Sequence, residues 1–287
     1  MQCVRFVCRW VVAFALLTSS AAYCSEIVTD HVQSMVLGRD LKFTVYLPDA
    51  YVGAKEKFPV VYLLHGYGGD ERSWVQGDGA RDILDDLIAR HQLRPTVVVM
   101  PTVSRSSWWI DRAGELAETA LMTELFPYVQ GKYNVNHEQS GRAVAGVSMG
   151  GYGALSLALR HPSKFCAAGL ISPAAYDPLP PETSAARKSP PFMRNGQFDP
   201  DSWKNHNYPA QLDAYARGSE RVPMWIVSGD HDHLGIALAS AELFWRILKI
   251  QPKQAELRII DGDHESSTFR AALPDLLQYL ARHCTGS

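Results

Sequence analysis

The chain alternates short, nearly continuous apolar runs with longer amphipathic segments over most of its length. A short apolar run is typical of a strand covered on both faces, whereas a 3.6-residue apolar period is typical of a helix. Strands are expected at residues 42–47, 58–64, 96–100, 143–147, 167–171, 224–227 and 257–260, and helices at 80–91, 115–132, 150–160, 236–250 and 267–282. This alternation predicts an α/β fold with a mostly parallel central sheet and helices on both faces.

Ser148 lies at the centre of Gly146-Val147-Ser148-Met149-Gly150, between an expected strand and an expected helix. In this context the motif is the nucleophile elbow of the α/β-hydrolase fold. The tight turn strains the serine backbone and lifts the hydroxyl clear of the sheet, and Gly146 and Gly150 let the strand and helix approach closely. The motif therefore predicts Ser148 as a nucleophile. The alternative is a glycine-rich turn with an ordinary serine.

The segment His65-Gly66-Tyr67-Gly68-Gly69 follows an early expected strand. In this fold one oxyanion-binding amide belongs to the residue after the nucleophile, and the other comes from such an early loop. We therefore assign the oxyanion to the backbone N–H groups of Met149 and Tyr67. His65 precedes the nucleophile, whereas the catalytic base of this fold follows it, so we expect His65 to hold the loop by hydrogen bonds.

His264 follows the last expected strand and precedes the last helix, where the fold requires its catalytic base. Its imidazole would take the Ser148 proton and return it to the leaving alcohol. The acid should follow strand 224–227, which leaves Asp230 and Asp232 as candidates. We favour Asp232 because the carboxylate must clear the strand end to reach the imidazole.

Four residues also form a candidate metal cluster, namely His231, Asp232, His233 and His264. The serine mechanism accounts for Asp232 and His264 without a metal, so we predict no metal and no cofactor. The formal net charge of −2 gives no strong field that would attract nucleic acid. The expected partner is a small-molecule or carbohydrate-linked ester.

The first 24 residues have the order of a secretory signal peptide. Arg5 and Arg9 precede an apolar run at residues 10–17, and small residues follow it. We expect cleavage between Ala21 and Ser25, which would release a secreted or periplasmic protein with no stable membrane insertion. The alternatives are an uncleaved membrane anchor and a lipoprotein site at Cys24, although the apolar run is shorter than the ~20 residues of a membrane span.

Three cysteines lie at or beyond the expected cleavage region. Cys166 lies in an apolar run and is expected to be a buried small hydrophobe. Cys24 and Cys284 lie near the two ends of the mature chain, so a disulfide between them is an open alternative in an oxidising compartment.

Residues 173–213 interrupt the alternation of strands and helices. The segment is rich in Pro, Ser, Asn and Asp and contains scattered aromatic residues. A loop this long inside a compact domain is usually functional or disordered. We expect residues 25–287 to form one α/β-hydrolase domain with a lid-like insertion here. The alternative is a surface excursion without a role in binding.

The sequence resembles the esterase branch of α/β-hydrolases that includes esterase D (S-formylglutathione hydrolase), bacterial feruloyl esterases and the mycobacterial antigen 85 mycolyltransferases. The resemblance covers roughly residues 43–280 and rests on the segments 64–69, 107–111, 146–154, 229–232 and 262–264. In relatives the acid stands three residues after the strand-end glycine, which matches Asp232. The relatives also imply that Trp108 and Trp109 form an aromatic wall for the substrate, with Asp111 anchoring the loop. Core packing is the alternative for both tryptophans.

The resemblance implies a serine carboxylic ester hydrolase that works through an acyl-enzyme. For a secreted relative, the expected substrates are acylated carbohydrates or hydroxycinnamoyl (feruloyl-type) esters. The alternatives are acyl transfer to a sugar hydroxyl, as in antigen 85, and a thioesterase like S-formylglutathione hydrolase. A binding protein on a hydrolase scaffold and a peptidase are more distant alternatives.

Overall fold

The computed structural model describes residues 25–284, so the predicted signal peptide lies outside the described residues. The main sheet has eight strands in the order β1-β2-β4-β3-β7-β8-β11-β12. These strands are β1 (Glu26–Ser34), β2 (Arg39–Leu47), β3 (Val60–Leu64), β4 (Val97–Thr102), β7 (Arg142–Val147), β8 (Ala167–Ile171), β11 (Met224–Gly229) and β12 (Ala255–Ile260). Two short hairpins join β5 (Asp111–Arg112) to β6 (Glu115–Leu116) and β9 (Met193–Arg194) to β10 (Gln197–Phe198).

The six strands from β4 to β12 in the sheet order run parallel, whereas β1 and β2 are antiparallel to their neighbours. This arrangement confirms the predicted α/β fold with a mostly parallel sheet. The sequence patterns did not predict β1. It is a largely exposed edge strand, so it lacks the continuous apolar run that marks a buried strand.

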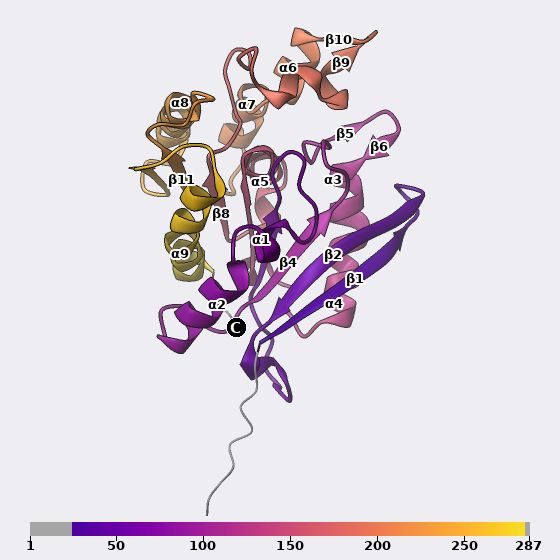
Figure 1. Cartoon of the computed structure of the whole chain (residues 1–287), viewed down its shortest axis with the longest axis vertical. Coiled ribbons are helices and arrows are strands. Elements are labelled where there is room, and N and C mark those ends of the chain that lie inside the picture. Colours follow the sequence, from indigo (N-terminus) through magenta and orange to yellow (C-terminus); the bar gives the residue numbers. More distant parts are fainter. Residues whose placement is uncertain (1–24, 285–287) are drawn as a thin grey trace, which may run out of the picture.

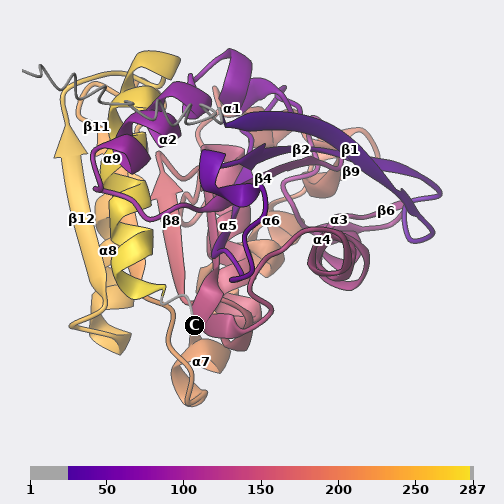
Figure 2. The same cartoon turned by 90° about the horizontal axis from the view of Figure 1, so that it is seen from below.

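Helices cover both faces of the sheet (Figures 1 and 2). They are α1 (Ser73–Gln76), α2 (Ala80–Ala89), α3 (Ala117–Ala120), α4 (Phe126–Lys132), α5 (Met149–Arg160), α6 (Pro200–His206), α7 (Pro209–Arg217), α8 (Ile236–Ile250) and α9 (Ser266–His283). One hydrophobic cluster packs α1, α2 and α9 on one face, and another packs α3, α4, α5 and α8 on the other. The helix expected at residues 115–132 begins at Ala117, because the preceding residues form the β5–β6 hairpin.

The insertion at residues 173–213 is a folded part of the domain. It contains the β9–β10 hairpin, α6 and α7, and the hairpin and α6 form the upper end of the molecule in Figure 1. Phe192 and Trp203 are fully buried and lie edge-on to Trp108, with ring centroids 5.2 and 5.8 Å away. The insertion therefore shares one aromatic core with the rest of the domain.

Cys166 and Cys284 form a disulfide, with their Cα atoms 5.2 Å apart. This pairing corrects the expectation that Cys166 is a buried small hydrophobe, and it leaves Cys284 bonded to Cys166 where pairing with Cys24 was an open alternative. The physical reason is the packing of α9 against β8, where a Cβ added to Gly169 would lie 2.6 Å from the Leu276 side chain. That packing brings the end of α9 to the start of β8.

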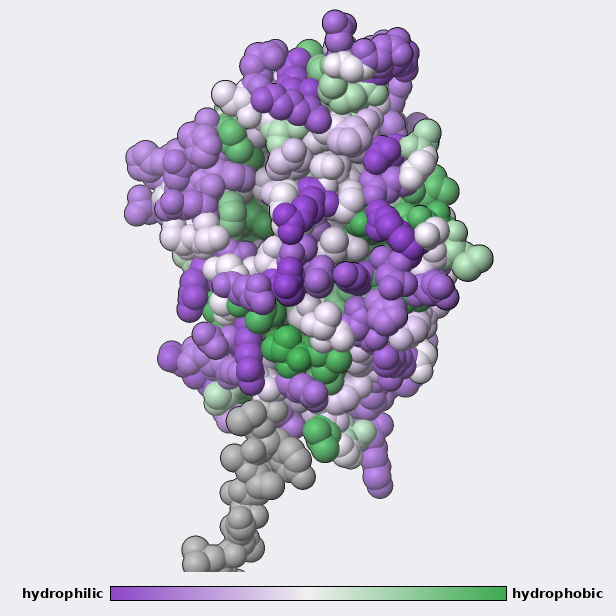
Figure 3. Space-filling view, turned by 45° about the vertical axis from the view of Figure 1, so that its right-hand side comes forward, coloured by the Kyte–Doolittle hydropathy of each residue, from purple (hydrophilic) through white to green (hydrophobic). Residues whose placement is uncertain are grey.

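The face of the molecule drawn in Figure 3 is mainly polar. Figure 3 shows one face on which hydrophobic residues form small patches separated by polar ones. Among residues 25–284, no helix combines the length and the apolar character that crossing a membrane requires.

Candidate active site

Ser148 occupies the turn between β7 and α5. Its backbone is strained, with φ of 55° and ψ of −117°. Three hydrogen bonds hold it in this conformation: its N–H donates to the Ile171 carbonyl (2.9 Å), and its carbonyl accepts from the amides of Tyr152 (2.9 Å) and Ala174 (3.1 Å). The neighbouring strand and the following helix thus fix the serine backbone from both sides.

The two motif glycines allow a very close approach of backbone segments. A Cβ atom added to Gly150 would lie 2.2 Å from the Leu64 carbonyl oxygen, and one added to Gly146 would lie 2.4 Å from the Gly150 carbonyl oxygen. Neither position can hold a side chain without movement of the backbone. The elbow therefore depends on glycine at both places for steric reasons.

A continuous hydrogen-bond chain joins Ser148, His264 and Asp232. The Ser148 hydroxyl lies 3.0 Å from His264 Nε2, and His264 Nδ1 lies 2.8 Å from Asp232 Oδ2. The Asp232 carboxylate is fully buried, and its other oxygen accepts from the Leu234 amide at 3.0 Å. With a proton on Nδ1, the imidazole can accept the serine proton at Nε2 while the carboxylate stabilises the resulting imidazolium.

Asp230, the other candidate acid, does not reach the imidazole of His264 by any hydrogen bond in the structure. Its carboxylate instead accepts hydrogen bonds from the Gly262 amide (3.1 Å) and from His231 Nδ1 (2.7 Å). The hydrogen bond from Gly262 and the pairing with His231 hold the pKa of Asp230 below its usual value. The geometry thus favours Asp232 as the partner of His264.

The amide of Met149 is next to Ser148 in the sequence, and the loop that carries the amide of Tyr67 lies next to Ser148 in space. Met149 is the first residue of α5, and Tyr67 follows Gly66, where an added Cβ would lie 3.6 Å from the Ser148 Cβ. Neither amide donates a hydrogen bond within the described part of the chain. Both are therefore free to bind an oxyanion.

His65 is buried under this loop. Its Nδ1 donates to the Gly66 carbonyl at 2.8 Å, and its ring packs edge-on against Trp109. Burial lowers its pKa, so the neutral form is favoured. These contacts match the structural role expected for His65 in holding the loop.

Trp108 and Trp109 are packed in the interior of the domain, as in the core-packing alternative to the aromatic wall that the family resemblance implied. Their exposed fractions are 1% and 0%. The indole N–H of Trp109 donates to the His65 carbonyl at 3.3 Å, and that of Trp108 donates to Ser189 in the insertion at 2.7 Å. The two rings are packed inside the domain, where they support the oxyanion loop and the insertion. Asp111 anchors the same segment by accepting from the Thr119 amide at 2.9 Å.

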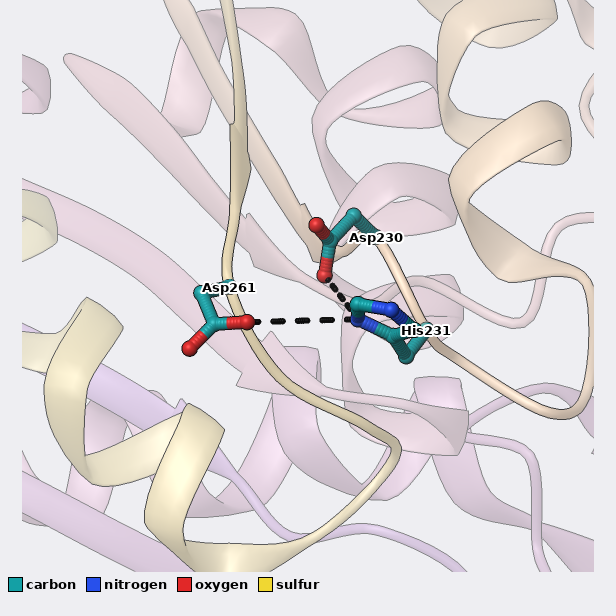
Figure 4. Close-up of side chains that lie close together, drawn as sticks. All are labelled: Asp230, His231 and Asp261. Atoms are coloured by element: carbon teal, nitrogen blue, oxygen red, sulfur yellow. Dashed lines mark hydrogen bonds and ion pairs between the residues drawn. The ribbon is translucent and has the colours of Figure 1, made fainter.

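The four residues considered as a metal cluster are engaged separately, since His264 bonds Asp232 and His233 bonds Asp263 at 2.7 Å. Figure 4 shows another group, Asp230, His231 and Asp261, whose side chains point toward one another. All three are exposed, and His231 already pairs with Asp230 at 2.7 Å and with Asp261 at 3.9 Å. We assign no metal to this group.

The chain is similar in sequence and structure to known esterases and to an acyltransferase. A family model described as "Putative esterase" matches residues 34–280. A solved ferulic acid esterase superposes with a TM-score of 0.78 and 27% identity, covering 92% of this chain and 100% of that one. An endo-1,4-beta-xylanase/feruloyl esterase of Xylanibacter ruminicola is 31% identical over 60% of this chain, which spans 26% of the length of that relative. A diacylglycerol acyltransferase/mycolyltransferase, Ag85B of Mycobacterium intracellulare, is 27% identical over 74% of this chain and 65% of its own length.

Proposed function

The chain belongs to this esterase family of α/β-hydrolases, and on that premise we propose that it is a secreted serine carboxylic ester hydrolase. The hydrogen-bond chain from Ser148 through His264 to Asp232 is the observation that carries the proposal. A hydroxyl, an imidazole and a buried carboxylate in this order form the machinery of acyl transfer through a serine.

In the first half of the reaction, Ser148 Oγ attacks the carbonyl carbon of the ester while its proton passes to His264 Nε2. The negative charge that develops on the carbonyl oxygen is held by the amides of Met149 and Tyr67. Collapse of this intermediate breaks the bond to the alcohol, which leaves with the proton from His264. The acyl group then remains on the serine as an ester.

In the second half, water takes the place of the alcohol. His264 removes a proton from the water, which attacks the acyl-enzyme through a second oxyanion intermediate. The serine leaves with the proton from His264, and the carboxylic acid is released. Asp232 keeps the imidazole in the same tautomer and orientation throughout, because its hydrogen bond to Nδ1 does not change.

Replacement of Ser148 tests the assignment. Ser148→Ala should abolish turnover of a short p-nitrophenyl ester and covalent labelling by a fluorophosphonate, with an unchanged circular dichroism spectrum. Ser267→Ala removes an exposed serine hydroxyl and is the matched control. Retention of wild-type activity in Ser148→Ala would show that another group is the nucleophile.

The proposed substrates are acylated carbohydrates and hydroxycinnamoyl esters. The proposal is supported by two similar proteins whose names include feruloyl or ferulic acid esterase. It predicts a higher kcat/KM for a feruloylated sugar or an acetylated xylo-oligosaccharide than for a simple p-nitrophenyl ester. A preference for S-formylglutathione would favour the thioesterase alternative instead.

Acyl transfer to a sugar hydroxyl is the second candidate function, and the similarity to an acyltransferase supports it. The same residues serve both reactions, since an alcohol can replace water in the second half. Mass spectrometry of the products, with and without a sugar acceptor, separates the two. An acylated acceptor formed in excess of free acid would identify a transferase.

Secretion is part of the proposal and is supported by the Cys166–Cys284 disulfide, because such bonds persist mainly in oxidising compartments. Sequencing the amino terminus of the exported protein tests it. A mature protein that begins between residues 22 and 25 would agree with the predicted cleavage, whereas a full-length chain in the cytoplasm would contradict it.

A further inference from the structure

Asp263, the residue before His264, connects two loops of the candidate site. One of its oxygens, Oδ1, accepts hydrogen bonds from the His233 amide (2.9 Å), from His233 Nδ1 (2.7 Å) and from the His264 amide (2.6 Å). His233 directly follows Asp232 in the chain. The Asp263 carboxylate therefore binds both loops, that of Asp232 and that of His264, next to the hydrogen bond between Asp232 and His264.

We propose that Asp263 is a positioning residue, which holds the His264 peptide and the Asp232 loop together so that His264 Nε2 stays in reach of Ser148. This inference rests on the proposed serine hydrolase function. Proton transfer requires the imidazole within about 0.5 Å of its productive position, so a small shift of the His264 backbone is sufficient to slow the reaction.

The backbone alone does not connect the two loops at this point. The last backbone hydrogen bonds between the two loops run from the Asp230 amide to the Ile260 carbonyl (2.9 Å) and from the His231 amide to the Gly262 carbonyl (3.0 Å). Beyond these bonds, the hydrogen bonds between the loops within residues 25–284 all involve side chains, from Asp230, Asp263 or the Asp232–His264 pair. Since β12 is an edge strand of the sheet, no further strand supports the His264 loop from outside.

The Asp263–His233 contact is exposed to solvent, so its role in positioning His264 can be separated from a role in stabilising the fold. The side chains of Asp263 and His233 are 45% and 62% exposed. Exposed ion pairs contribute little to the free energy of unfolding. Loss of Asp263 should therefore slow the reaction of molecules that remain folded.

The experiment compares Asp263→Ala and Asp263→Asn with Asp261→Asn. Asp261 is the matched control because it is a carboxylate in the same loop, is 99% exposed and accepts no hydrogen bond from the backbone in the structure. The readouts are the second-order rate constant for fluorophosphonate labelling of Ser148, kcat and KM for a p-nitrophenyl ester counted per labelled site, and the melting temperature.

For Asp263→Ala we expect the labelling rate and kcat to fall on the order of 10- to 100-fold, with KM within about twofold of the wild type. Asp263→Asn should recover part of the rate, because its amide oxygen can still accept hydrogen bonds. Asp261→Asn should behave as the wild type. Wild-type labelling in Asp263→Ala, or an equal loss in Asp261→Asn, would overturn the proposal.

A second variant covers the case in which Asp263→Ala does not fold. His233→Ala removes one of the three hydrogen bonds and keeps the backbone donor, so it should slow labelling less than loss of the carboxylate does. Wild-type labelling in both His233→Ala and Asp263→Asn would overturn the positioning role. A wild-type protein that does not label at Ser148 would overturn the proposed function itself, which is a separate outcome.

Discussion

The proposed nucleophile and its proposed acid–base partners are held in place by different kinds of contact. Ser148 is fixed by backbone hydrogen bonds inside the domain and by two glycines that allow segments to approach closely. His264 and Asp232 lie on two loops, 32 residues apart in the chain, that are joined by side chains near the surface. The elbow is thus a property of the folded backbone, whereas the acid–base pair depends on a few specific side chains.

This difference separates the effects of mutation. Side chains added at the elbow glycines should damage the fold together with the activity, because α5 and β7 pack too closely there to admit them. Changes in the acid–base loops should reduce the rate in a protein that remains folded. The following predictions test this contrast, beginning with the largest expected effect.

Replacement of the buried acid should greatly reduce the rate without unfolding the protein. Asp232→Asn should lower kcat by about 10⁴-fold, equivalent to about 5.5 kcal/mol, because an amide no longer holds the correct imidazole tautomer. Asp230→Asn is the control, since that carboxylate was the alternative acid and hydrogen-bonds His231 and the Gly262 amide instead of the His264 imidazole. An equal loss in both variants, measured with the same ester, would contradict the assignment of Asp232.

A methyl group at the elbow should instead destabilise the whole domain. Gly150→Ala would place a Cβ 2.2 Å from the Leu64 carbonyl oxygen, so we expect the free energy of unfolding to fall by about 3–5 kcal/mol. Gly131→Ala is the control, because a Cβ there has no neighbour within 4 Å. Urea denaturation measures both. Unchanged stability in Gly150→Ala would show that the elbow tolerates more movement than the structure implies.

The disulfide should contribute to stability but not to the chemistry. It joins the residue before β8 to the residue after α9, whereas the proposed catalytic residues follow the carboxyl ends of their strands. The double variant Cys166→Ala, Cys284→Ala should lose about 2–4 kcal/mol of unfolding free energy and keep wild-type kcat at 25 °C. Thermal denaturation and ester hydrolysis measure the two quantities. A fall in kcat without a change in melting temperature would contradict this separation.

The sequence predicted those features that depend on local patterns. Buried parallel strands such as residues 143–147 and 224–227 have continuous apolar runs, and the structure contains a strand at each place. The family resemblance and the α/β-hydrolase fold were also correct, because the motif around Ser148 is contiguous and has a steric requirement for glycine. The candidate residues Ser148, Asp232 and His264 were chosen from their places after three of the expected strands, and the structure brings them together.

Features that depend on distant packing were not predictable in the same way. The pairing of Cys166 with Cys284 follows from how α9 lies on β8, and no local pattern encodes it. Trp108 is buried under Phe192 and Trp203 of the insertion, and Trp109 is buried against His65, contacts that sequence order alone does not reveal. The sequence analysis also did not predict the positioning role proposed for Asp263, although a carboxylate directly before His264 could have suggested it.

The smallest predicted effect concerns the pH dependence of the Asp263–His233 contact. Hydrogen bonds from the His233 amide and ring and from the His264 amide hold the pKa of Asp263 well below its usual value. Stability from this group is therefore present above about pH 4 and lost as the pH falls through the folded-state pKa. The hydrogen bond to Asp263 also raises the pKa of His233 above 6.5, so the contribution of the charged ring is present below that value and lost as the pH rises through the raised pKa.

The difference in melting temperature between the wild type and Asp263→Asn should accordingly be largest between about pH 4 and 6.5 and should shrink on both sides. It should be small even at its maximum, because both side chains are exposed to solvent. Calorimetry of the two proteins from pH 3 to 9 measures the difference, and Asp261→Asn provides the baseline for loss of a charge in the same loop. A difference that grows as the pH falls below 4 would contradict the assigned direction of the Asp263 pKa. It would also show that the contact of Asp263 with the His264 loop does not depend on a charged carboxylate.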